Sequence, residues 1–180
     1  YIQPLIDYGH IHFGENKVQE TLSKWSEQKK INNNLKLHMI RKLQSNKAKD
    51  AVKIFDYIHS VDNQKLADVL AKSQINLNKN LKYFIQVNIG NEIQKSGIPV
   101  NDLDGFYNYC VKEINLNILG LMVIPPIDQS HQKYFKLLND LNKSLSLENL
   151  SMGMSADYID AIKYGSNFVR VGSSIFGPRS

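Results

Sequence analysis

The sequence predicts an α/β fold of the TIM type, a (β/α)8 barrel that lacks its first strand and the helix before it. Short runs of β-branched and aromatic residues alternate with longer segments of helical periodicity almost to the end of the chain. The runs number seven, whereas a closed barrel of this type has about eight strands. The G-x-G-x-x-G turn of a dinucleotide-binding open sheet is absent from the sequence, which favours the barrel.

Each β-like run is followed by a helix-like segment, as in parallel strands joined by right-handed crossovers. The runs cover residues 10–16, 35–40, 57–61, 81–90, 116–124, 149–152 and 168–172. The helical segments cover residues 17–29, 45–55, 63–74, 101–114, 128–145 and 156–164, and a single turn follows the last run. Spacings such as that of Leu66, Val69 and Leu70 place an apolar stripe against the sheet.

The composition indicates one domain spanning residues 1–180. Of its 180 residues, 42% are hydrophobic and 22% are charged, as in ordinary globular domains. Since the sequence shows neither a long apolar run nor a signal-peptide pattern, we expect a cytoplasmic protein without a membrane partner, as a monomer or weak dimer. The one cysteine, Cys110, lies at helical spacing from Phe106 and Ile114, which favours a buried packing role.

The formal charge of +5 is unevenly distributed. Ten Lys or Arg residues face three acidic residues between Lys17 and Lys53. This excess attracts anions, either nucleic acid or a phosphorylated small molecule. A nucleic-acid motif does not accompany it, so we do not expect nucleic acid as a partner.

The histidines do not predict a metal site. His10 and His12 share one strand face, but a third ligand does not lie near them in the sequence. His38 and His59 lie inside apolar strands. We expect all four to be structural, and a Ser-His-Asp or nucleophile-elbow pattern does not occur.

Two polar turns predict a phosphate site after the last two strands, where barrels often place one. In the segment SMGMSAD, Gly153 permits a tight strand exit, and Ser155 is expected to cap a helix that begins at residue 156. In RVGSS, Gly172 lets the backbone approach a ligand closely, while Ser173 and Ser174 add donors.

Arg170 is expected to point into the barrel. The alternation of a strand places Phe168, Arg170 and Gly172 on one face, and it places Val169 and Val171 on the other, against the helices. An inward arginine needs an acceptor. Two partners stay open, a carboxylate on a neighbouring strand or a bound ligand.

Seven segments occur in a fixed order: FGENKVQE, HMIRKLQSNKAK, IHSVD, QVNIGNEIQKSG, GLMVIP, SMGMSADY and VRVGSSIFG. Together they closely resemble the pyridoxal phosphate homeostasis protein family, and the resemblance runs through the whole chain. It implies a fold-type III barrel, similar to the N-terminal domain of alanine racemase, that binds pyridoxal 5′-phosphate (PLP). It also implies a non-catalytic carrier or buffer in intracellular PLP homeostasis.

The resemblance implies that five residues bind the cofactor. It implies no catalytic residue and no metal ligand. Asn16 would lie by the cofactor ring, and Arg170 would face the pyridine nitrogen. Ser155, Gly172 and Ser173 would hold the phosphate. An arginine keeps the ring nitrogen unprotonated and makes the ring a poorer electron sink, which suits a carrier or a racemase that needs modest stabilisation.

Two features depart from the family pattern. The family's Schiff-base lysine lies on a strand before the FGEN segment, so we expect this chain to lack that lysine strand and to bind PLP weakly and non-covalently. Arg41 stands where the family usually has glycine, and we expect it to distort the strand exit.

Two alternative functions stay open. An alanine-racemase-like, PLP-dependent isomerase would need a second domain and a second base, and the sequence offers three residues after Gly177. A non-catalytic protein could instead bind nucleic acid through the basic segment 17–53.

Overall fold

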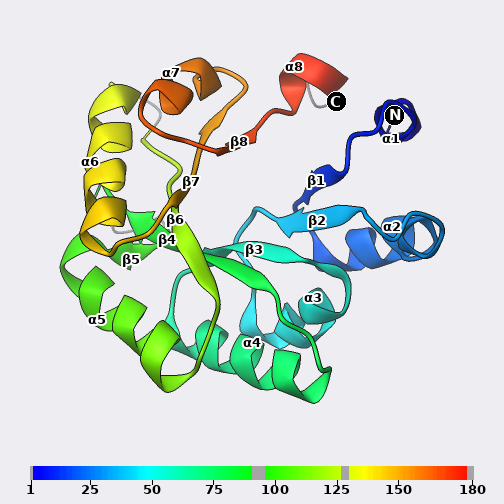
Figure 1. Cartoon of the computed structure of the whole chain (residues 1–180), viewed down its shortest axis with the longest axis horizontal. Helices are drawn as coiled ribbons and strands as arrows, with labels where there is room; N and C mark the ends of the chain where they lie inside the picture. Colours follow the sequence, from blue (N-terminus) through cyan, green and yellow to red (C-terminus); the bar gives the residue numbers. More distant parts are fainter. Residues whose placement is uncertain (1, 91–95, 127–129, 178–180) are drawn as a thin grey trace.

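The computed structural model describes residues 2–90, 96–126 and 130–177. Parallel strands form one curved sheet in the order β1-β2-β3-β4-β6-β7-β8 (Figure 1). These strands are β1 (His12–Glu15), β2 (Lys36–Met39), β3 (Tyr57–Val61), β4 (Lys82–Asn88), β6 (Ile118–Met122), β7 (Asn149–Met154) and β8 (Phe168–Arg170). All seven predicted strands are therefore confirmed. A two-residue strand, β5 (Ile98–Pro99), pairs with β4 and was not predicted.

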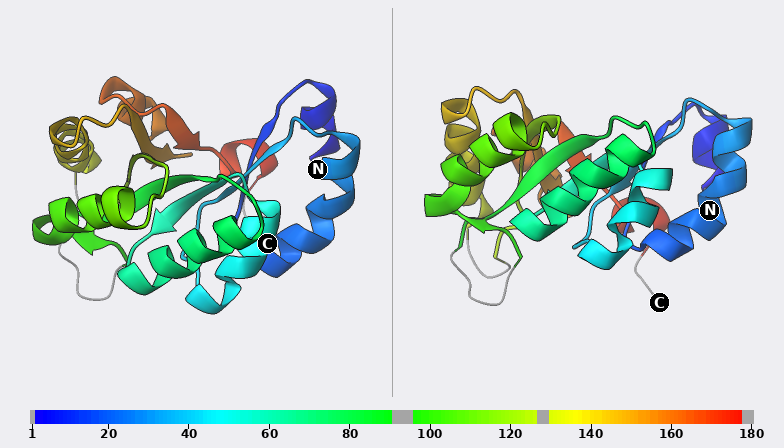
Figure 2. Two further views of the ribbon diagram at one scale, coloured as in Figure 1. Left: turned by 60° about the horizontal axis from the view of Figure 1, so that its bottom comes forward. Right: turned by 90° about the horizontal axis from the view of Figure 1, so that it is seen from below.

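Helices alternate with the strands and cover the outer face of the curved sheet (Figure 2). They are α2 (Val18–Ile31), α3 (Ala48–Ile54), α4 (Gln64–Asn76), α5 (Leu103–Asn108), α6 (His131–Ser144), α7 (Tyr158–Lys163) and α8 (Ser173–Phe176). Helical turns extend two of them, η1 (Ser45–Lys47) before α3, and η2 (Val100–Asp102) and η3 (Tyr109–Glu113) around α5. The short α1 (Gln3–Asp7) before β1 was not predicted.

The sheet curves into a barrel that is nearly closed. Among the described residues, β1 and β8 each pair with one neighbour, and hydrogen bonds do not join them to each other. Figure 1 shows these two strands at the two ends of the curved sheet. The predicted fold class, a parallel α/β barrel built from seven strands, is confirmed.

The larger core lies between the strands and the helices. Trp25 of α2 is fully buried there, and its Nε1 donates to Glu15 Oε1 of β1 at 2.7 Å. Phe135 of α6 is also fully buried. Cys110 packs in the same core, and burial raises the pKa of its thiol to about 12. The predicted packing role of this cysteine is therefore confirmed.

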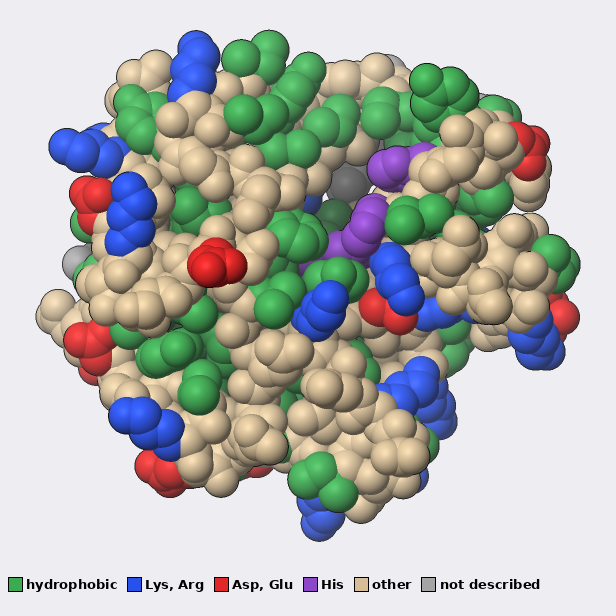
Figure 3. Space-filling model, viewed as in Figure 1, with side chains coloured by type: hydrophobic (Ala, Val, Ile, Leu, Met, Phe, Trp, Pro, Cys, Tyr) green, Lys and Arg blue, Asp and Glu red, His purple; other side chains and the backbone are tan. Residues whose placement is uncertain are grey.

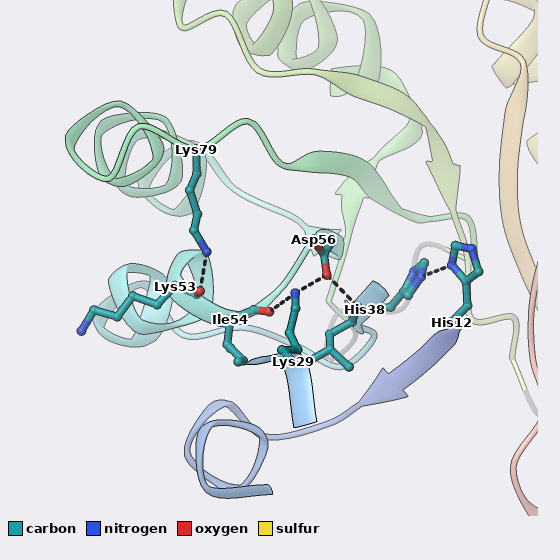
Figure 4. Close-up of polar contacts among 8 residues, drawn as sticks. His12, Lys29, His38, Lys53, Ile54, Asp56 and Lys79 are labelled. Carbon is teal, nitrogen blue, oxygen red and sulfur yellow. Dashed lines mark hydrogen bonds and ion pairs between the residues drawn. The ribbon is translucent and has the colours of Figure 1, made fainter. Parts of the chain in front are cut away.

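Asp56 joins three elements at the start of β3 (Figure 4). Its Oδ2 accepts from Lys29 Nζ of α2 at 2.7 Å and from the Leu37 N–H of β2 at 2.8 Å. The same lysine donates to the Ile54 carbonyl at 3.1 Å. One carboxylate thus fixes α2 against the sheet and holds β2 beside β3.

A second, smaller core fills the inside of the barrel. Tyr57, Phe84 and Met122 form its buried cluster. Two buried histidines stack on its aromatic rings: His38 lies 4.1 Å from Tyr57 and His59 lies 4.5 Å from Phe84, measured between ring centroids. The predicted structural role of these two histidines is confirmed, and they pack against the smaller core.

Both interior histidines are neutral at pH 7. Burial lowers the pKa of His38 to about 3, and the nearby His12 adds to that effect. Burial also holds the pKa of His59 well below its usual value, and His38 and Arg170 add to the effect. The aromatic surroundings cannot solvate an imidazolium, so the barrel interior excludes the charged form.

The close contact between β6 and β7 predicts a large effect of Gly120→Ala. A Cβ at Gly120 would lie 1.7 Å from the Asn149 carbonyl oxygen, so the two strands would have to separate. We expect the free energy of unfolding in urea to fall by at least about 2 kcal/mol. Gly105→Ala in α5 is the matched control, since nothing lies within 4 Å of that position, and it should raise stability by about 0.5–1 kcal/mol. Equal effects of the two substitutions would contradict this account.

The neutral histidines predict a loss of stability in acid. Below pH 6.5 the unfolded chain binds protons at His38 and His59. The folded chain binds the proton at His38 only near pH 3, and the pKa of His59 in the folded chain is also well below 6.5. The free energy of unfolding should therefore decrease by about 1.4 kcal/mol per pH unit for each histidine across this window. Urea titrations between pH 4 and 6.5 measure the slope. His38→Gln should reduce the slope of the free energy of unfolding against pH by the contribution of one histidine. An unchanged slope would show that His38 is not buried in its neutral form.

Candidate functional site

The strand exit after β7 requires glycine. Gly153 has a φ of +93°, in the left-handed region that favours glycine. A Cβ here would lie 2.6 Å from Ala161 Cβ and 2.9 Å from Tyr158 Cα of α7. The predicted tight exit is confirmed, and it brings α7 close against the end of β7.

Ser155 lies in the turn after β7 but does not cap the helix, so the predicted cap is wrong. The helix begins at Tyr158, and Asp157 takes the N–H of Met154 on its Oδ1 at 2.6 Å. His131 holds the other oxygen of Asp157 at 2.8 Å. Ser155 Oγ instead accepts from the Gly172 N–H at 3.0 Å, which joins the two turns that the sequence singled out.

Gly172 begins the second turn, beside open space. Its φ is −127°, and nothing lies within 4 Å of the position that a Cβ would occupy. Ser173 and Ser174 follow at the start of α8, and both are exposed. Their backbone N–H groups do not bond any other described residue, as is usual in the first turn of a helix. The turn therefore offers free donors next to an open volume.

Arg170 points into the barrel, as the sequence predicted. Its Nη1 donates to Ser151 Oγ at 2.8 Å and to the Ser151 carbonyl at 3.2 Å, and its Nη2 donates to the Val123 carbonyl at 2.9 Å. These partners are a serine and two carbonyls of neighbouring segments rather than a carboxylate. Val169, which was expected against the helices, is instead 37% exposed, so that part of the prediction is wrong.

The Arg170 guanidinium stays charged and keeps donors free. Burial lowers its pKa to about 10, while Asp157 opposes that shift, so the group is protonated at neutral pH. A guanidinium has five N–H donors, and three hydrogen bonds to described residues account for three of them. Two donors remain for an acceptor brought by a ligand.

A line of hydrogen bonds runs from Ser151 through three histidines, and we call these four residues the histidine row. Ser151 Oγ lies 2.8 Å from His59 Nδ1, and His59 Nε2 lies 2.9 Å from His38 Nδ1. His38 Nε2 lies 2.8 Å from Nδ1 of the exposed His12, a contact drawn in Figure 4. In the space-filling view, histidine side chains line a hollow in the face of the molecule (Figure 3).

Asn16 and Arg41 are not hydrogen-bond partners of Ser155, Arg170 or Gly172 among the described residues. Asn16 follows β1 and is half-buried, and among the described residues it makes no hydrogen bond to Ser155, Arg170 or Gly172. Arg41 is exposed and is not among the residues with left-handed backbone, so its backbone shows no strain of that kind, and a distortion of the strand exit stays a prediction. A hydrogen bond joins Ser155 to Gly172, which lies next to Ser173 and two residues after Arg170, whereas hydrogen bonds do not join Asn16 to these described residues.

Metal-binding and membrane-spanning features were also sought in the part of the chain that the structure describes. There, His, Cys, Asp and Glu side chains do not form a group of three or more that could hold a metal ion. The helices in that part are too short or too polar to cross a bilayer.

Comparisons with known proteins connect this geometry to a family. The family model for the alanine racemase N-terminal domain matches residues 2–180. A pyridoxal phosphate homeostasis protein of Aquifex aeolicus is 37% identical over 176 residues, which are 93% of this chain and 76% of that protein. A protein of the same name from Schizosaccharomyces pombe is 39% identical over 182 residues, which are 95% of this chain and 76% of that protein.

Solved structures agree with the sequence relatives. PipY of Synechococcus elongatus PCC7942, solved with PLP bound, is 35% identical and superposes with a TM-score of 0.90, covering 98% of this chain and 86% of PipY. An alanine racemase of Clostridium difficile superposes with a TM-score of 0.71 at 13% identity, covering 98% of this chain and 47% of the racemase, which shows a shared fold. The chain therefore belongs to the pyridoxal phosphate homeostasis proteins, within the family of the alanine racemase N-terminal domain.

Proposed function

We propose that this protein binds PLP reversibly and takes part in intracellular PLP homeostasis as a carrier or buffer rather than as an enzyme. The observation that carries the proposal is the hydrogen bond between Ser155 Oγ and the Gly172 N–H, which joins two donor-bearing turns beside Arg170. The names of the sequence relatives and the PLP bound to PipY support it.

The residues at the two turns fit a phosphate group. Because Ser155 Oγ accepts from Gly172, the serine hydroxyl hydrogen stays available to donate to an anion. The N–H group of Ser173 adds a second donor, and the open volume at Gly172 leaves room for phosphate oxygens. Ser155, Gly172 and Ser173 would hold the phosphate in this arrangement.

Arg170 fits the ring of the cofactor. Its two free N–H donors suit an unprotonated pyridine nitrogen, and its charge at neutral pH prevents it from accepting a proton from that nitrogen. PLP supplies an aldehyde and an electron-withdrawing ring when bound, and an unprotonated ring withdraws electrons weakly. Arg170 would therefore favour holding the aldehyde over stabilising carbanions. Asn16, which follows β1 at the same edge of the sheet, would approach the ring from the other side of the opening.

The proposal extends to the form of the protein in the cell. A single sheet spans residues 12–170, which supports one barrel domain over residues 1–180. We propose that this domain acts in the cytoplasm as a monomer or weak dimer. The likeness to alanine racemase is one of fold, so it does not favour an isomerase.

Removal of the Ser155 hydroxyl should weaken PLP binding selectively. Ser155→Ala deletes one phosphate donor and leaves the Gly172 N–H without its acceptor, so we expect the Kd for PLP to rise about tenfold, or about 1.4 kcal/mol. Equilibrium dialysis measures the change. Pyridoxal, which has no phosphate, should bind wild type and variant equally, and Ser23→Ala on the exposed face of α2 serves as the matched control. An equal loss for pyridoxal would disprove the phosphate role of Ser155.

PLP should bind this chain without a covalent bond. Among the described residues, lysine side chains form no hydrogen bond with Ser155, Arg170 or Gly172. We therefore propose that these residues hold PLP without a lysine of the described chain bonded to its aldehyde. After treatment with borohydride and denaturation, mass spectrometry should find the chain unmodified at the site, and dialysis should remove the cofactor. Stoichiometric trapping of PLP on one lysine would overturn the reversible mode of binding.

A further inference from the structure

Arg170 and the histidine row form one continuous line of hydrogen bonds across the barrel. The line begins at Arg170 Nη1 on β8, crosses Ser151 on β7 and His59 on β3, and reaches His38 on β2 and His12 on β1. Each contact is 2.8–2.9 Å long. His59 and His38 are 2% and 6% exposed, whereas His12 at the end is exposed. The line therefore crosses the barrel from β8 to β1, the two strands at the ends of the sheet.

The direction of the hydrogen bonds is set at Arg170. A guanidinium can only donate, so Ser151 Oγ accepts from Nη1. The serine hydroxyl has a single hydrogen, and His59 Nδ1 lies within bonding distance of it. Ser151 is fully buried, so its hydroxyl hydrogen needs an acceptor inside the protein. Among the described residues, His59 Nδ1 is the acceptor within reach of this hydroxyl, so we infer that Ser151 donates to His59 Nδ1 and that this ring nitrogen carries no hydrogen.

The same reasoning extends to the outer rings. A neutral imidazole has one donor nitrogen and one acceptor nitrogen. Because His59 accepts at Nδ1, it donates from Nε2 to His38 Nδ1. His38 then donates from Nε2 to His12 Nδ1, and the hydrogen of His12 lies on Nε2. All three histidines are thereby fixed as the Nε2–H tautomer.

The surroundings exclude a charged ring in the line. Both ring nitrogens of an imidazolium are donors, so a charged His38 or His59 would direct an N–H against a neighbour that already donates to it. The stacked Tyr57 and Phe84 rings offer this N–H no other acceptor. Burial lowers the pKa of His12 as well, with Lys36 and Lys82 adding to that effect and Asp56 opposing it.

We propose that the residues of the histidine row are positioning residues that hold the guanidinium of Arg170 in place. Their hydrogen bonds all run in one direction, from Arg170 to His12, and all three histidines are Nε2–H tautomers. The three imidazoles meet nitrogen to nitrogen rather than converging on a point, so this role differs from metal binding. The effect on a bound cofactor rests on the proposed function, whereas the tautomers do not depend on it.

Nitrogen-15 NMR on the labelled chain without PLP tests the line directly. Long-range correlations between ring nitrogens and ring carbon-bound hydrogens distinguish the two neutral tautomers and the imidazolium. At pH 7, we expect His12, His38 and His59 all to be neutral Nε2–H tautomers. An Nδ1–H tautomer or an imidazolium at any of the three would overturn the proposal, and this measurement requires only the unsubstituted protein.

If Arg170 sets the direction of the hydrogen bonds, variants at the two ends of the line should differ in their effect on the tautomers of His38 and His59. His12→Phe removes the outer ring, and His38 and His59 should remain Nε2–H because the inner donors are intact. Ser151→Ala separates the histidines from Arg170 and should give mixed tautomers at His59 and His38. Ser151→Thr keeps the hydroxyl and should restore the single tautomer. Equal effects of His12→Phe and Ser151→Ala would overturn a direction set at Arg170.

Binding measurements separate this inference from the proposed function. Ser151→Ala should weaken both PLP and pyridoxal about tenfold, because Arg170 would act on the ring rather than on the phosphate. Ser151→Thr should recover most of the affinity. Unchanged affinity of Ser151→Ala would overturn the positioning role. If the unsubstituted protein bound no PLP, the proposed function would fail, and the NMR tautomers would still decide the hydrogen-bond line.

Discussion

The guanidinium of Arg170 points into the barrel and needs hydrogen-bond acceptors, and this requirement determines how the site is arranged. Arg170 enters the barrel from β8, and three of its donors bond Ser151 of β7 and the Val123 carbonyl just after β6. Since a buried guanidinium without acceptors would be strongly unfavourable, these contacts hold the last strands in register beside the opening. The turns after β7 and β8 are thereby placed side by side, where Ser155 bonds Gly172.

Burial is the main reason that His38 and His59 are neutral, and Arg170 adds to the effect at His59. A carboxylate beside Arg170 would pair with it and remove its free donors, whereas a serine satisfies one donor and transmits the direction of hydrogen bonding to His59. The charge of Arg170 also disfavours a second cation nearby, in addition to the effect of burial on His59. Neutral rings can stack on Tyr57 and Phe84, so the polar line and the aromatic core occupy the same interior.

Strands and long helices could be predicted because their apolar residues repeat at clear periods, whereas α1 and β5 are too short to show one. The inward side of Arg170 followed from strand alternation alone. The sequence offers both Ser155 and Asp157 as side chains that could accept a backbone N–H in this turn, and it does not show which of them does so. In the structure, Asp157 accepts from the Met154 N–H. The histidine row was missed because each histidine was considered on its own strand, although inward positions on adjacent strands would have suggested contact.

Under the proposed function, the arrangement suits a site that holds a ligand rather than one that transforms it. A catalyst of proton transfer needs a group that can both gain and release a proton near neutral pH. Arg170 stays protonated, and both ring nitrogens of His59 are engaged in fixed hydrogen bonds. Moving a proton along the row would reverse the tautomer of each histidine against the direction that Arg170 imposes. The residues that would contact the ring therefore orient it and retain its protonation state, which is the chemistry of a carrier.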